Sequence, residues 1–262
     1  MLLNARNNKK KTGWGIWRYF LDGKPEYLAR HYWWAYLWSV SVWFFDHQPI
    51  INAILFGQYH RLCQRAVNDC MKKRPQGRFL QLTCAYGSLT PSLIRNMDDD
   101  LYLMDVADIQ LALTDKKLEG PEHRRLLSAR MNAERLAYCE NAFSTVLIFF
   151  LLHELPPDAR NRCLAETIRV LQPGGRLIIA EYAACPKKHF LWRFLPTRAV
   201  LLYLEPFLGS FWNMDLPAAL MEQGRKHGKA IQLVEEFHCF FAFYRVCIFE
   251  IALPHNGLAG DR

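Results

Sequence analysis

Residues 79–90 read Phe-Leu-Gln-Leu-Thr-Cys-Ala-Tyr-Gly-Ser-Leu-Thr, and this segment constrains the fold more than any other part of the chain. A mostly apolar strand leads into a turn that ends at Gly87, and Thr90-Pro91 supplies a helix N-cap followed by proline at the first helical position. Asp105 follows eighteen residues after Gly87, at the end of a second apolar run. An acid at that spacing is placed to accept hydrogen bonds from ribose hydroxyls. The pattern therefore predicts a strand, a turn and a helix that bind a nucleotide cofactor.

The turn itself lacks most of the glycines that such a site usually has. A dinucleotide-type turn carries three glycines, whereas here Thr83, Ala85 and Tyr86 precede the single Gly87. Many α/β proteins contain a strand, turn and helix with one glycine and bind nothing there. Both a cofactor site and an ordinary structural turn are therefore compatible with this segment alone.

The charge balance narrows the possible partners. The chain carries 33 Lys and Arg against 25 Asp and Glu, a formal net charge of +8, and eight of its residues are Trp. Such a protein suits nucleic acid or an anionic membrane surface. Residues 1–24 form a basic N-terminal tail in which Arg6 and 9–11 precede Trp14 and Trp17, an order typical of an interfacial anchor. We expect peripheral membrane contact and no nucleic-acid binding.

Residues 25–77 are expected to form an aromatic-rich helical cap. Residues 32–45 are almost wholly apolar, 46–49 break the helix, and 50–66 continue it. Fourteen apolar residues are fewer than the roughly 20 that a bilayer-spanning helix needs. The cap either packs on the sheet and closes a pocket, or lies in the membrane plane as a lid for a lipid substrate.

Strands and helices alternate over residues 78–253, which predicts a parallel sheet covered by helices. The expected strands are 78–83, 101–105, 126–131, 145–152, 176–182, 230–236 and 240–252, the last two forming an edge hairpin, and the expected helices include 109–118 and 160–171. Residues 183–229 form an insertion and 254–262 a C-terminal tail. The eight cysteines show no Cys-Xaa-Xaa-Cys spacing, which indicates reduced thiols in a cytosolic protein.

Several motifs together resemble the class I S-adenosylmethionine-dependent methyltransferases. Residues 169–175, Arg-Val-Leu-Gln-Pro-Gly-Gly, are similar to the Arg-Val-Leu-Lys-Pro-Gly-Gly turn of that family. Asp105 falls on its ribose-binding acid, and 132–134, Asn-Ala-Glu, falls where the family often has Asp-Ala beside adenine. The resemblance implies a Rossmann-like α/β fold with a mostly parallel sheet, an antiparallel edge strand and helices on both faces. It also implies S-adenosylmethionine as cofactor, bound by Thr83, Ala85, Tyr86, Gly87, Asp105, Val106, Asn132 and Ala133.

A narrower set of segments resembles the rhodoquinone biosynthesis (RquA) family. These segments are 32–36, 53–57, 84–90, 105–111, 149–154 and 204–212. The resemblance implies conversion of ubiquinone to rhodoquinone, in which an amino group from S-adenosylmethionine replaces a methoxy group. A conventional methyltransferase acting on a quinone or lipid is the alternative enzyme. A non-catalytic, membrane-associated binding or assembly protein is the alternative of a different class.

The candidate catalytic residues are His153, Glu154 and Tyr182. His153 and Glu154 follow a buried strand, at the sheet edge where ligands lie in open α/β folds. Amino transfer needs a base, and an acid or a metal that activates the quinone carbonyl. A divalent cation such as Mn is therefore one expected cofactor, with no ligand set named. Alternatively, His153 is an ordinary residue of such folds and Glu154 only begins the next helix, with Asp158 as the rival N-cap.

The expected substrate is an apolar quinone with an isoprenoid tail. Five aromatic residues outside the minimal fold are expected to contact it: Tyr32, Trp33, Trp34, Phe207 and Trp212. The alternative is that these rings only complete a core, as aromatic runs usually do. The charge and the aromatic residues together predict a cytoplasmic protein, attached peripherally to the inner face of a membrane.

Overall fold

The computed structural model describes residues 16–72 and 75–253. A seven-stranded sheet with strand order β3-β2-β1-β4-β5-β7-β6 forms its centre. The strands are β1 (Phe79–Leu82), β2 (Leu101–Asp105), β3 (Leu126–Arg130), β4 (Phe143–Phe149), β5 (Leu171–Tyr182), β6 (Ile231–Cys239) and β7 (Tyr244–Ile251). The first five are parallel to one another, while β7 pairs antiparallel with both β5 and β6. The predicted edge hairpin and mostly parallel sheet are confirmed.

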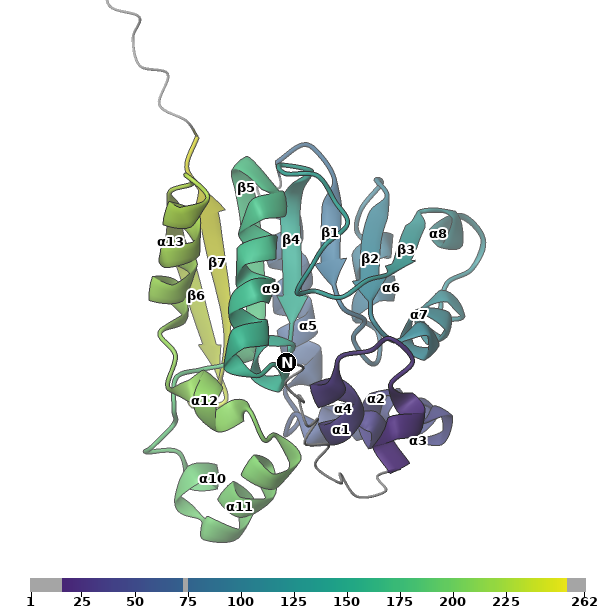
Figure 1. The fold of residues 1–262 in the computed structure, drawn as a ribbon, viewed down its shortest axis with the longest axis vertical. Coiled ribbons are helices and arrows are strands. Elements are labelled where there is room, and N and C mark those ends of the chain that lie inside the picture. The colour runs from purple at the N-terminus through teal and green to yellow at the C-terminus, as the bar shows by residue number, and fades with distance from the viewer. Residues whose placement is uncertain (1–15, 73–74, 254–262) are drawn as a thin grey trace, which may run out of the picture.

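Helices cover both faces of the sheet (Figure 1). They are α5 (Tyr59–Met71), α6 (Leu89–Arg95), α7 (Asp108–Asp115), α8 (Gly120–Arg124), α9 (Pro157–Val170) and α13 (Leu216–Lys226). Helices α9 and α13 contact each other on one face, and α5 and α6 contact each other on the opposite face. All residues of β1 and β4 are buried between these layers, which is why both strands are mostly apolar.

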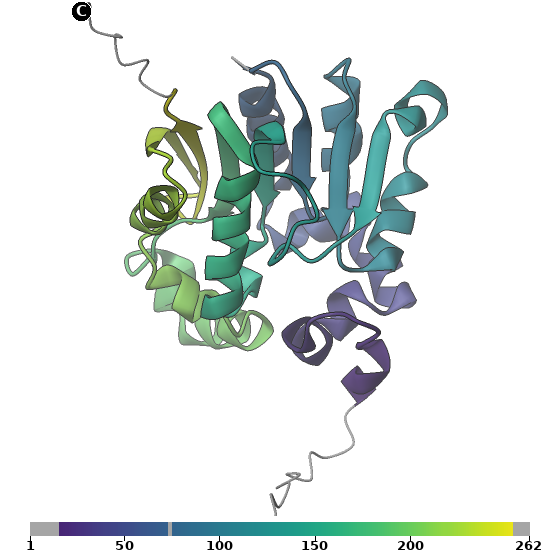
Figure 2. The same ribbon diagram turned by 45° about the horizontal axis from the view of Figure 1, so that its top comes forward.

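Two further groups of helices lie at the edge where the parallel strands end (Figures 1 and 2). The N-terminal group is η1 (Ile16–Phe20), α1 (Glu26–His31), α2 (Trp33–Tyr36), α3 (Ser39–Phe45) and α4 (Gln48–Ile54); the insertion contributes α10 (Phe190–Arg193), α11 (Leu195–Leu204) and α12 (Leu208–Trp212). The short η2 (Leu152–Glu154) follows β4 at the same edge. Residues distant in sequence therefore meet where an open α/β sheet binds ligands.

The cap is more broken than its sequence predicts. The expected helix over 32–45 is divided at Leu37 and Trp38, because Trp38 takes an extended conformation. The expected helix over 50–66 is interrupted between α4 and α5, where Phe56 and Gly57 both have positive φ. A helix can pass neither through an extended residue nor through two successive left-handed residues, so each predicted helix becomes two.

Three local predictions at helix ends and turns were wrong. The N-cap of α6 is Ser88, and the buried Thr90 hydroxyl instead donates to Gln81 Oε1 at 3.1 Å. Helix α9 has Pro156 at its N-cap, so Asp158 lies within the first turn. The Gln-Pro-Gly-Gly turn belongs to an irregular start of β5, because Leu171 already pairs with Phe143.

The eight cysteines are all free, as their spacing predicted. Within residues 16–72 and 75–253, no helix is both long and apolar enough to cross a bilayer. The basic residues of 1–15 and the expected tail 254–262 lie outside the described residues.

Candidate active site

A cleft of about 660 Å³, including the part open to solvent, lies beyond the ends of β1 and β2. We call it the Asp105 cleft. Its wall contains Thr83, Asp105, Val106, Asn132 and Ala133, five of the residues expected to bind a cofactor.

Asp105 is the buried acid of this cleft. One of its carboxylate oxygens accepts from the Cys84 N–H and the other from the Ala107 N–H, both at 2.8 Å. Burial raises the pKa of Asp105 to about 6, although these two donors oppose the shift. Each oxygen keeps a second lone pair, so the carboxylate can also accept from a ligand hydroxyl. The acid is therefore held in place by the chain and remains able to bind a ribose.

The altered turn is fastened to the cap. The Tyr86 hydroxyl donates to the Ala35 carbonyl and accepts from Gln110 Nε2 at 2.9 Å. Its ring stacks on Tyr36 with 5.6 Å between ring centroids. Gly87 has a φ of +77°, and a Cβ there would overlap the Tyr59 hydroxyl. The turn residues thus use side chains and cap contacts where a glycine-rich turn would leave open space.

His153 lies at the centre of a second cleft on the other side of this turn. We call this the His153 cleft, and its wall also includes Ile51, Ile54, Tyr182 and Glu205. Phe150 has a positive φ directly after β4, which turns the chain so that η2 carries His153 back over the sheet edge. Tyr182 packs against the imidazole with 4.8 Å between ring centroids.

Glu181 orients His153. Its fully buried carboxylate accepts from the backbone N–H groups of Leu152 at 2.6 Å, His153 at 3.2 Å and Tyr182 at 3.0 Å. Glu181 Oε2 also lies 2.9 Å from His153 Nδ1. An ionised carboxylate only accepts, so Nδ1 carries the hydrogen and Nε2 faces the cleft. Glu181 therefore positions the histidine.

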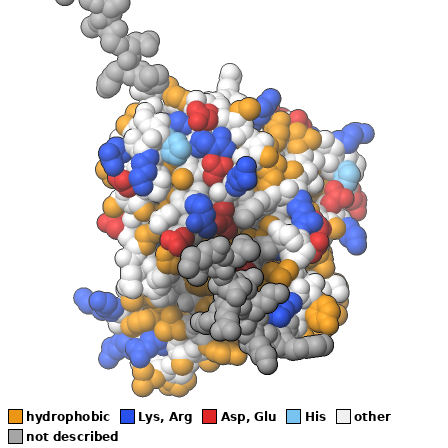
Figure 3. Space-filling view, viewed as in Figure 1, with side chains coloured by type: hydrophobic (Ala, Val, Ile, Leu, Met, Phe, Trp, Pro, Cys, Tyr) orange, Lys and Arg blue, Asp and Glu red, His pale blue; other side chains and the backbone are white. Residues whose placement is uncertain are grey.

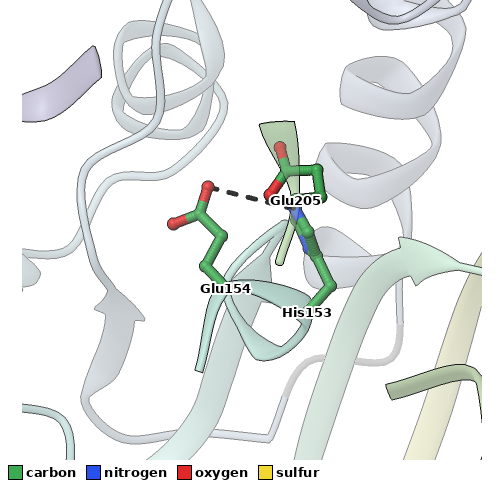
Figure 4. A group of neighbouring side chains, drawn as sticks. All are labelled: His153, Glu154 and Glu205. Carbon is green, nitrogen blue, oxygen red and sulfur yellow. Dashed lines mark ion pairs between the residues drawn. The ribbon is translucent and has the colours of Figure 1, made fainter. Parts of the chain in front are cut away.

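Two more carboxylates face Nε2 of this histidine. Glu154 Oε1 lies 3.9 Å and Glu205 Oε2 3.7 Å from that nitrogen, and Figure 4 shows both acids beside the imidazole. The cap holds both, since the Tyr36 hydroxyl donates to Glu154 and the Tyr32 hydroxyl donates to Glu205 at 3.0 Å. The cluster therefore combines residues of η2, the insertion and the cap.

Burial and mutual repulsion shift the proton affinities of the cluster. Burial raises the pKa of Glu154 to about 8, with Glu205 adding repulsion and His153 opposing it. Burial also raises the pKa of Glu205. For His153 burial lowers the pKa, but the surrounding carboxylates, Glu181 foremost, outweigh it and raise that pKa to about 9. A site in which several groups have pKa values near neutral pH can take up and release a proton during a reaction.

The two clefts share part of their walls. Tyr36, Cys84, Phe150 and Glu154 line both the Asp105 cleft and the His153 cleft. These four side chains thus border both clefts. Glu154 is the one acid common to both linings.

Arg160 fastens the insertion to the site. This fully buried guanidinium donates to the carbonyls of Leu152 and Leu155 at 2.8 Å each. It also donates to the Phe207 carbonyl at 3.3 Å and to Ser210 Oγ at 3.1 Å. Because these acceptors belong to η2 and to the start of α12, Arg160 keeps Glu205 beside His153.

The structure brings most, but not all, of the predicted site residues together. Ala85 and Tyr86 line the His153 cleft rather than the Asp105 cleft, and the Gly87 N–H donates to Asp46 at 2.8 Å. Phe207 and Trp212 pack against Tyr32 and Tyr182 respectively. Trp33 stacks on Phe20, and Trp34 packs on Phe45. Neither of these two tryptophans lines either cleft.

Two polar residues near the clefts differ in exposure. Asp108 begins α7 with an exposed carboxylate 3.2 Å from Arg130 Nε. Only 6% of His189 is exposed, because its imidazole packs between Phe190 and Phe243 and caps α10.

Sequence reasoning missed Tyr36, Arg160 and Glu205. Glu205 carries a signal, since it is the only acid between Glu181 and Asp215. Burying an isolated carboxylate costs free energy unless a partner compensates its charge. An acid that stands alone in an apolar, basic segment is therefore a candidate site residue. Tyr36 carries no such signal because it stands among other aromatic residues. Arg160 stands in an ordinary polar helix pattern.

The donor set of the cluster fits a divalent cation. One imidazole nitrogen and one oxygen from each of Glu154 and Glu205 lie within 4.8 Å of one another. Imidazole and carboxylate groups are ligands for Mn, Fe and Zn. The other ring nitrogen of His153, Nδ1, is hydrogen-bonded to Glu181. Metal-bound histidines usually donate this second N–H to a carboxylate or a carbonyl.

Comparisons with known proteins agree with this architecture. Residues 44–218 match the ubiE/COQ5 methyltransferase family. The chain is 31% identical over 141 residues to a ubiquinone/menaquinone biosynthesis C-methyltransferase (UbiE) of Vibrio parahaemolyticus, covering 51% of this chain and 52% of that protein. It is 28% identical over 138 residues to a demethylmenaquinone methyltransferase of Bacillus mycoides, covering 52% and 57% respectively. The chain thus spans about half the length of the curated relatives it matches.

Solved structures show the same fold. The [4+2]-cyclase SpnF aligns with a TM-score of 0.52 at 16% identity, covering 74% of this chain and 80% of that one. An S-adenosylmethionine-dependent methyltransferase from Mesorhizobium loti aligns with a TM-score of 0.50 at 11% identity, covering 72% and 97%. At these identities the likeness concerns the fold alone, so the reaction must be argued from the site.

Proposed function

Because the chain belongs to the ubiE/COQ5 methyltransferase family, we propose that it transfers a methyl group from S-adenosylmethionine to the ring of a quinone-type substrate. The observation that carries the proposal is the shared wall of the two clefts. It would place a cofactor in the Asp105 cleft and an apolar ring in the His153 cleft, with Glu154 between them. Proximity and orientation account for much of the rate of a displacement reaction of this kind.

The Asp105 cleft fits the cofactor. Asp105 is a buried acceptor with free lone pairs, and Val106, Asn132 and Ala133 complete the wall beside it. Asp105 would hold the ribose and the other three the adenine. When bound, S-adenosylmethionine supplies a methyl group on a positively charged sulfur. The faces of Tyr36 and Phe150, which line the same cleft, can stabilise that positive charge.

The His153 cleft fits an aromatic, largely apolar acceptor. Its wall includes Ile51, Leu55, Phe149 and Tyr182 around the buried acids. The relatives are named for ubiquinone and menaquinone. These names and the apolar lining together favour a quinol ring as acceptor. Tyr32 and Phe207 border the cluster from outside, so we propose that their rings help to enclose the substrate.

The acidic cluster supplies the proton acceptor. In C-methylation a C–C bond forms at the ring carbon as the C–S bond breaks with its electron pair left on sulfur. The ring carbon then loses its proton, and Glu154 is the acid that lines both clefts. His153, oriented by Glu181, holds a positive charge beside Glu154 and Glu205 and so favours their ionised forms. Glu154 is therefore assigned as the base and Glu181 as a positioning residue.

The test uses purified protein, S-adenosylmethionine and reduced quinols that lack one ring methyl group. The expected result is a product heavier by one methylene, detected by mass spectrometry and lost in Asp105→Ala and in Glu154→Gln. Exposed Glu119 offers the control substitution Glu119→Gln, which should keep full activity. Cofactor binding without transfer to any ring would contradict the proposal.

A second candidate is the replacement of a ubiquinone methoxy group by an amino group, giving rhodoquinone. The observation that favours it is the donor set of His153, Glu154 and Glu205. Plain methyl transfer needs no metal, whereas amination benefits from a Lewis acid that polarises the quinone carbonyl. If a divalent cation such as Mn binds, these three side chains would hold it, and it would supply that polarisation.

Expression in a bacterium that makes ubiquinone but no rhodoquinone separates the two reactions. A new aminoquinone in the extracted lipids, absent with Glu205→Gln, would support amination. A ring-methylated product that persists after treatment of the purified enzyme with a chelator would support metal-free methylation. Unchanged quinones in cells with folded protein, together with no transfer in vitro, would instead favour a non-catalytic binding or assembly role.

A further inference from the structure

Helix α11 is mostly apolar, yet none of its residues is buried. Leu195 is 63% exposed, Val200 57% and Tyr203 85%. Ten helical residues span about 15 Å, half the thickness of a bilayer core, so α11 can lie along a surface but cannot cross it. A cluster of large exposed apolar side chains on a folded protein marks a place of contact with another phase or molecule.

The exposed apolar surface extends well beyond α11. Phe190 and Phe194 of the preceding segment are 56% and 60% exposed, and Phe241 in the β6–β7 turn is 84% exposed. The Phe240 ring lies 5.8 Å from Phe190, 6.2 Å from Phe241 and 5.7 Å from Phe56 (ring centroids). We name the apolar rim by its members: Ile54, Phe56, Phe190, Phe194, Leu195, Val200, Tyr203 and Phe241.

The charge beside the apolar rim has one sign. Residues 183–204 contain Lys187, Lys188, Arg193 and Arg198 and no Asp or Glu. Lys187, Lys188 and Arg193 are exposed, and Arg198 lies over the Trp192 ring at 5.1 Å. Figure 3 shows basic side chains next to hydrophobic ones at the end of the molecule where Figure 1 places α10 and α11. Such a pairing suits a surface that is negatively charged outside and apolar within.

The rim also adjoins the His153 cleft. Ile54 belongs to both, since it lines the cleft and is 46% exposed. Glu205, one of the acids facing His153, is the residue that directly follows α11. A membrane or molecule that contacts the apolar rim would therefore lie beside the His153 cleft and against α11, the helix that precedes Glu205.

We propose that the apolar rim rests on an anionic phospholipid bilayer, with α10 and α11 lying in the interface. The inference rests on the proposed function in one respect, that a bilayer is where an apolar quinone dissolves. The exposed phenylalanines and α11 would enter the acyl boundary, while Lys187, Lys188 and Arg193 would meet lipid phosphates. A quinone could then pass beside Ile54 into the His153 cleft without crossing water.

Flotation of the full chain with vesicles tests the proposal. The expected result is recovery with vesicles of phosphatidylglycerol and phosphatidylcholine, and little recovery with phosphatidylcholine alone. Phe194→Ser combined with Tyr203→Ser should lower the bound fraction by about tenfold or more, because both side chains would lose their contact with the acyl boundary. The control is Met221→Ser on α13, where an apolar side chain away from the apolar rim is 57% exposed; this variant should bind like the wild type.

A second set of variants tests the charge. Lys187→Gln, Lys188→Gln and Arg193→Gln together should reduce binding by about tenfold or more and remove most of its salt dependence. The control neutralises Lys116, Arg124 and Lys226, three exposed cations elsewhere on the surface. Equal losses in the two triple variants would overturn the proposed docking face, since net charge alone would then explain binding.

The outcomes separate docking from catalysis. Methyl transfer to a short-chain, water-soluble quinol does not require a bilayer, so the rim variant should keep that activity while losing activity on a quinol embedded in vesicles. Absence of flotation with either vesicle would overturn docking and leave the proposed function standing. A rim that instead drives dimerisation, with the dimer lost in Phe194→Ser and Tyr203→Ser and no flotation, would likewise overturn docking.

Discussion

The Asp105 cleft and the His153 cleft share a wall but differ in how they are built. Apart from cap residues such as Tyr27 and Tyr36, the Asp105 cleft is lined by strand ends and by the segments that follow them. The His153 cleft is completed by Glu205 from the insertion and by Ile51 and Ile54 of α4. Loops at strand ends are dictated by the sheet, so the first cleft comes with the fold. The second depends on how two added helical groups meet.

The two clefts therefore belong to different parts of the molecule. The fold is shared with a cyclase and with a methyltransferase, whereas the His153 cleft needs the helices added at the sheet edge. Tyr36 joins the two, because it lines both clefts, stacks on Tyr86 and donates to Glu154. Changes in each cleft should therefore have separable effects, except at this junction.

The largest expected effect is on turnover in the His153 cleft. Glu154→Gln keeps the size of the side chain but removes the base, so kcat should fall by about 10²–10⁴-fold. Because Glu154 also lines the Asp105 cleft, the calorimetric affinity for S-adenosylmethionine should fall too, but by much less than kcat, since Asp105 is untouched. Steady-state kinetics and titration on the same preparation check both values. An unchanged kcat would show that Glu154 is not the base, and the His153 cleft would then have no assigned catalytic role.

The next effect is on cofactor affinity in the Asp105 cleft. Asp105→Asn replaces one acceptor oxygen by an N–H donor that must face the Cys84 or Ala107 N–H. Hydrogen bonds to a charged group are worth about 1.5–3 kcal/mol, so the affinity for S-adenosylmethionine should fall by about 100-fold. Calorimetry measures the loss, with Asp108→Asn on the exposed neighbour as the control. Equal affinities in both variants would refute the role of Asp105.

A smaller effect is expected at the junction. The Tyr36 hydroxyl lowers the pKa of Glu154 by donating to it, so Tyr36→Phe should raise that pKa above its value of about 8. The midpoint of the rise in kcat with pH should move upward by the same shift. Tyr32→Phe, which acts on Glu205, is the matched comparison and should move the midpoint less. A midpoint that stays in place for Tyr36→Phe would show that another group controls the rate.

The smallest effect is on stability. The pKa values of Asp105 and Glu154 are raised to about 6 and 8 and that of His153 to about 9. Folded protein therefore binds more protons than unfolded protein from mildly acidic pH up to about 9, and stability falls as pH rises through this window. The melting temperature should therefore fall as pH rises through this window, and it should fall less in Glu154→Gln. A melting temperature that rises with pH would contradict these directions.

Much of the fold was predictable because it depends on local patterns. The continuous apolar run of β4 and the edge hairpin were predicted from hydrophobicity and spacing, and the structure confirms them. The helix breaks at Trp38 and Phe56 were not predicted. Nothing in an apolar stretch indicates that Trp38 will be extended or that Phe56 will have a positive φ. Tertiary contacts decided these positions against helix propensity.

The candidate site was predictable in part for the same reason. Asp105, Asn132, His153 and Glu154 follow strands, so the sequence places them at one edge of the sheet. Tyr36 and Arg160 were missed because their partners lie 118 and up to 50 residues away in sequence. No periodicity links such positions, and only the packing of the cap and insertion against η2 brings them together.

The sequence alone predicted an α/β sheet, an acid at the end of β2, a histidine and an acid after β4, and a basic chain rich in aromatic residues. These features depend on composition and on the pattern of neighbouring residues. The tertiary structure decided that Glu181 orients His153, that Glu205 joins the cluster and that α11 stays exposed. The physical reason is that burial and charge pairing depend on contacts between distant segments. A buried carboxylate acquires its proton affinity from the groups that folding places around it.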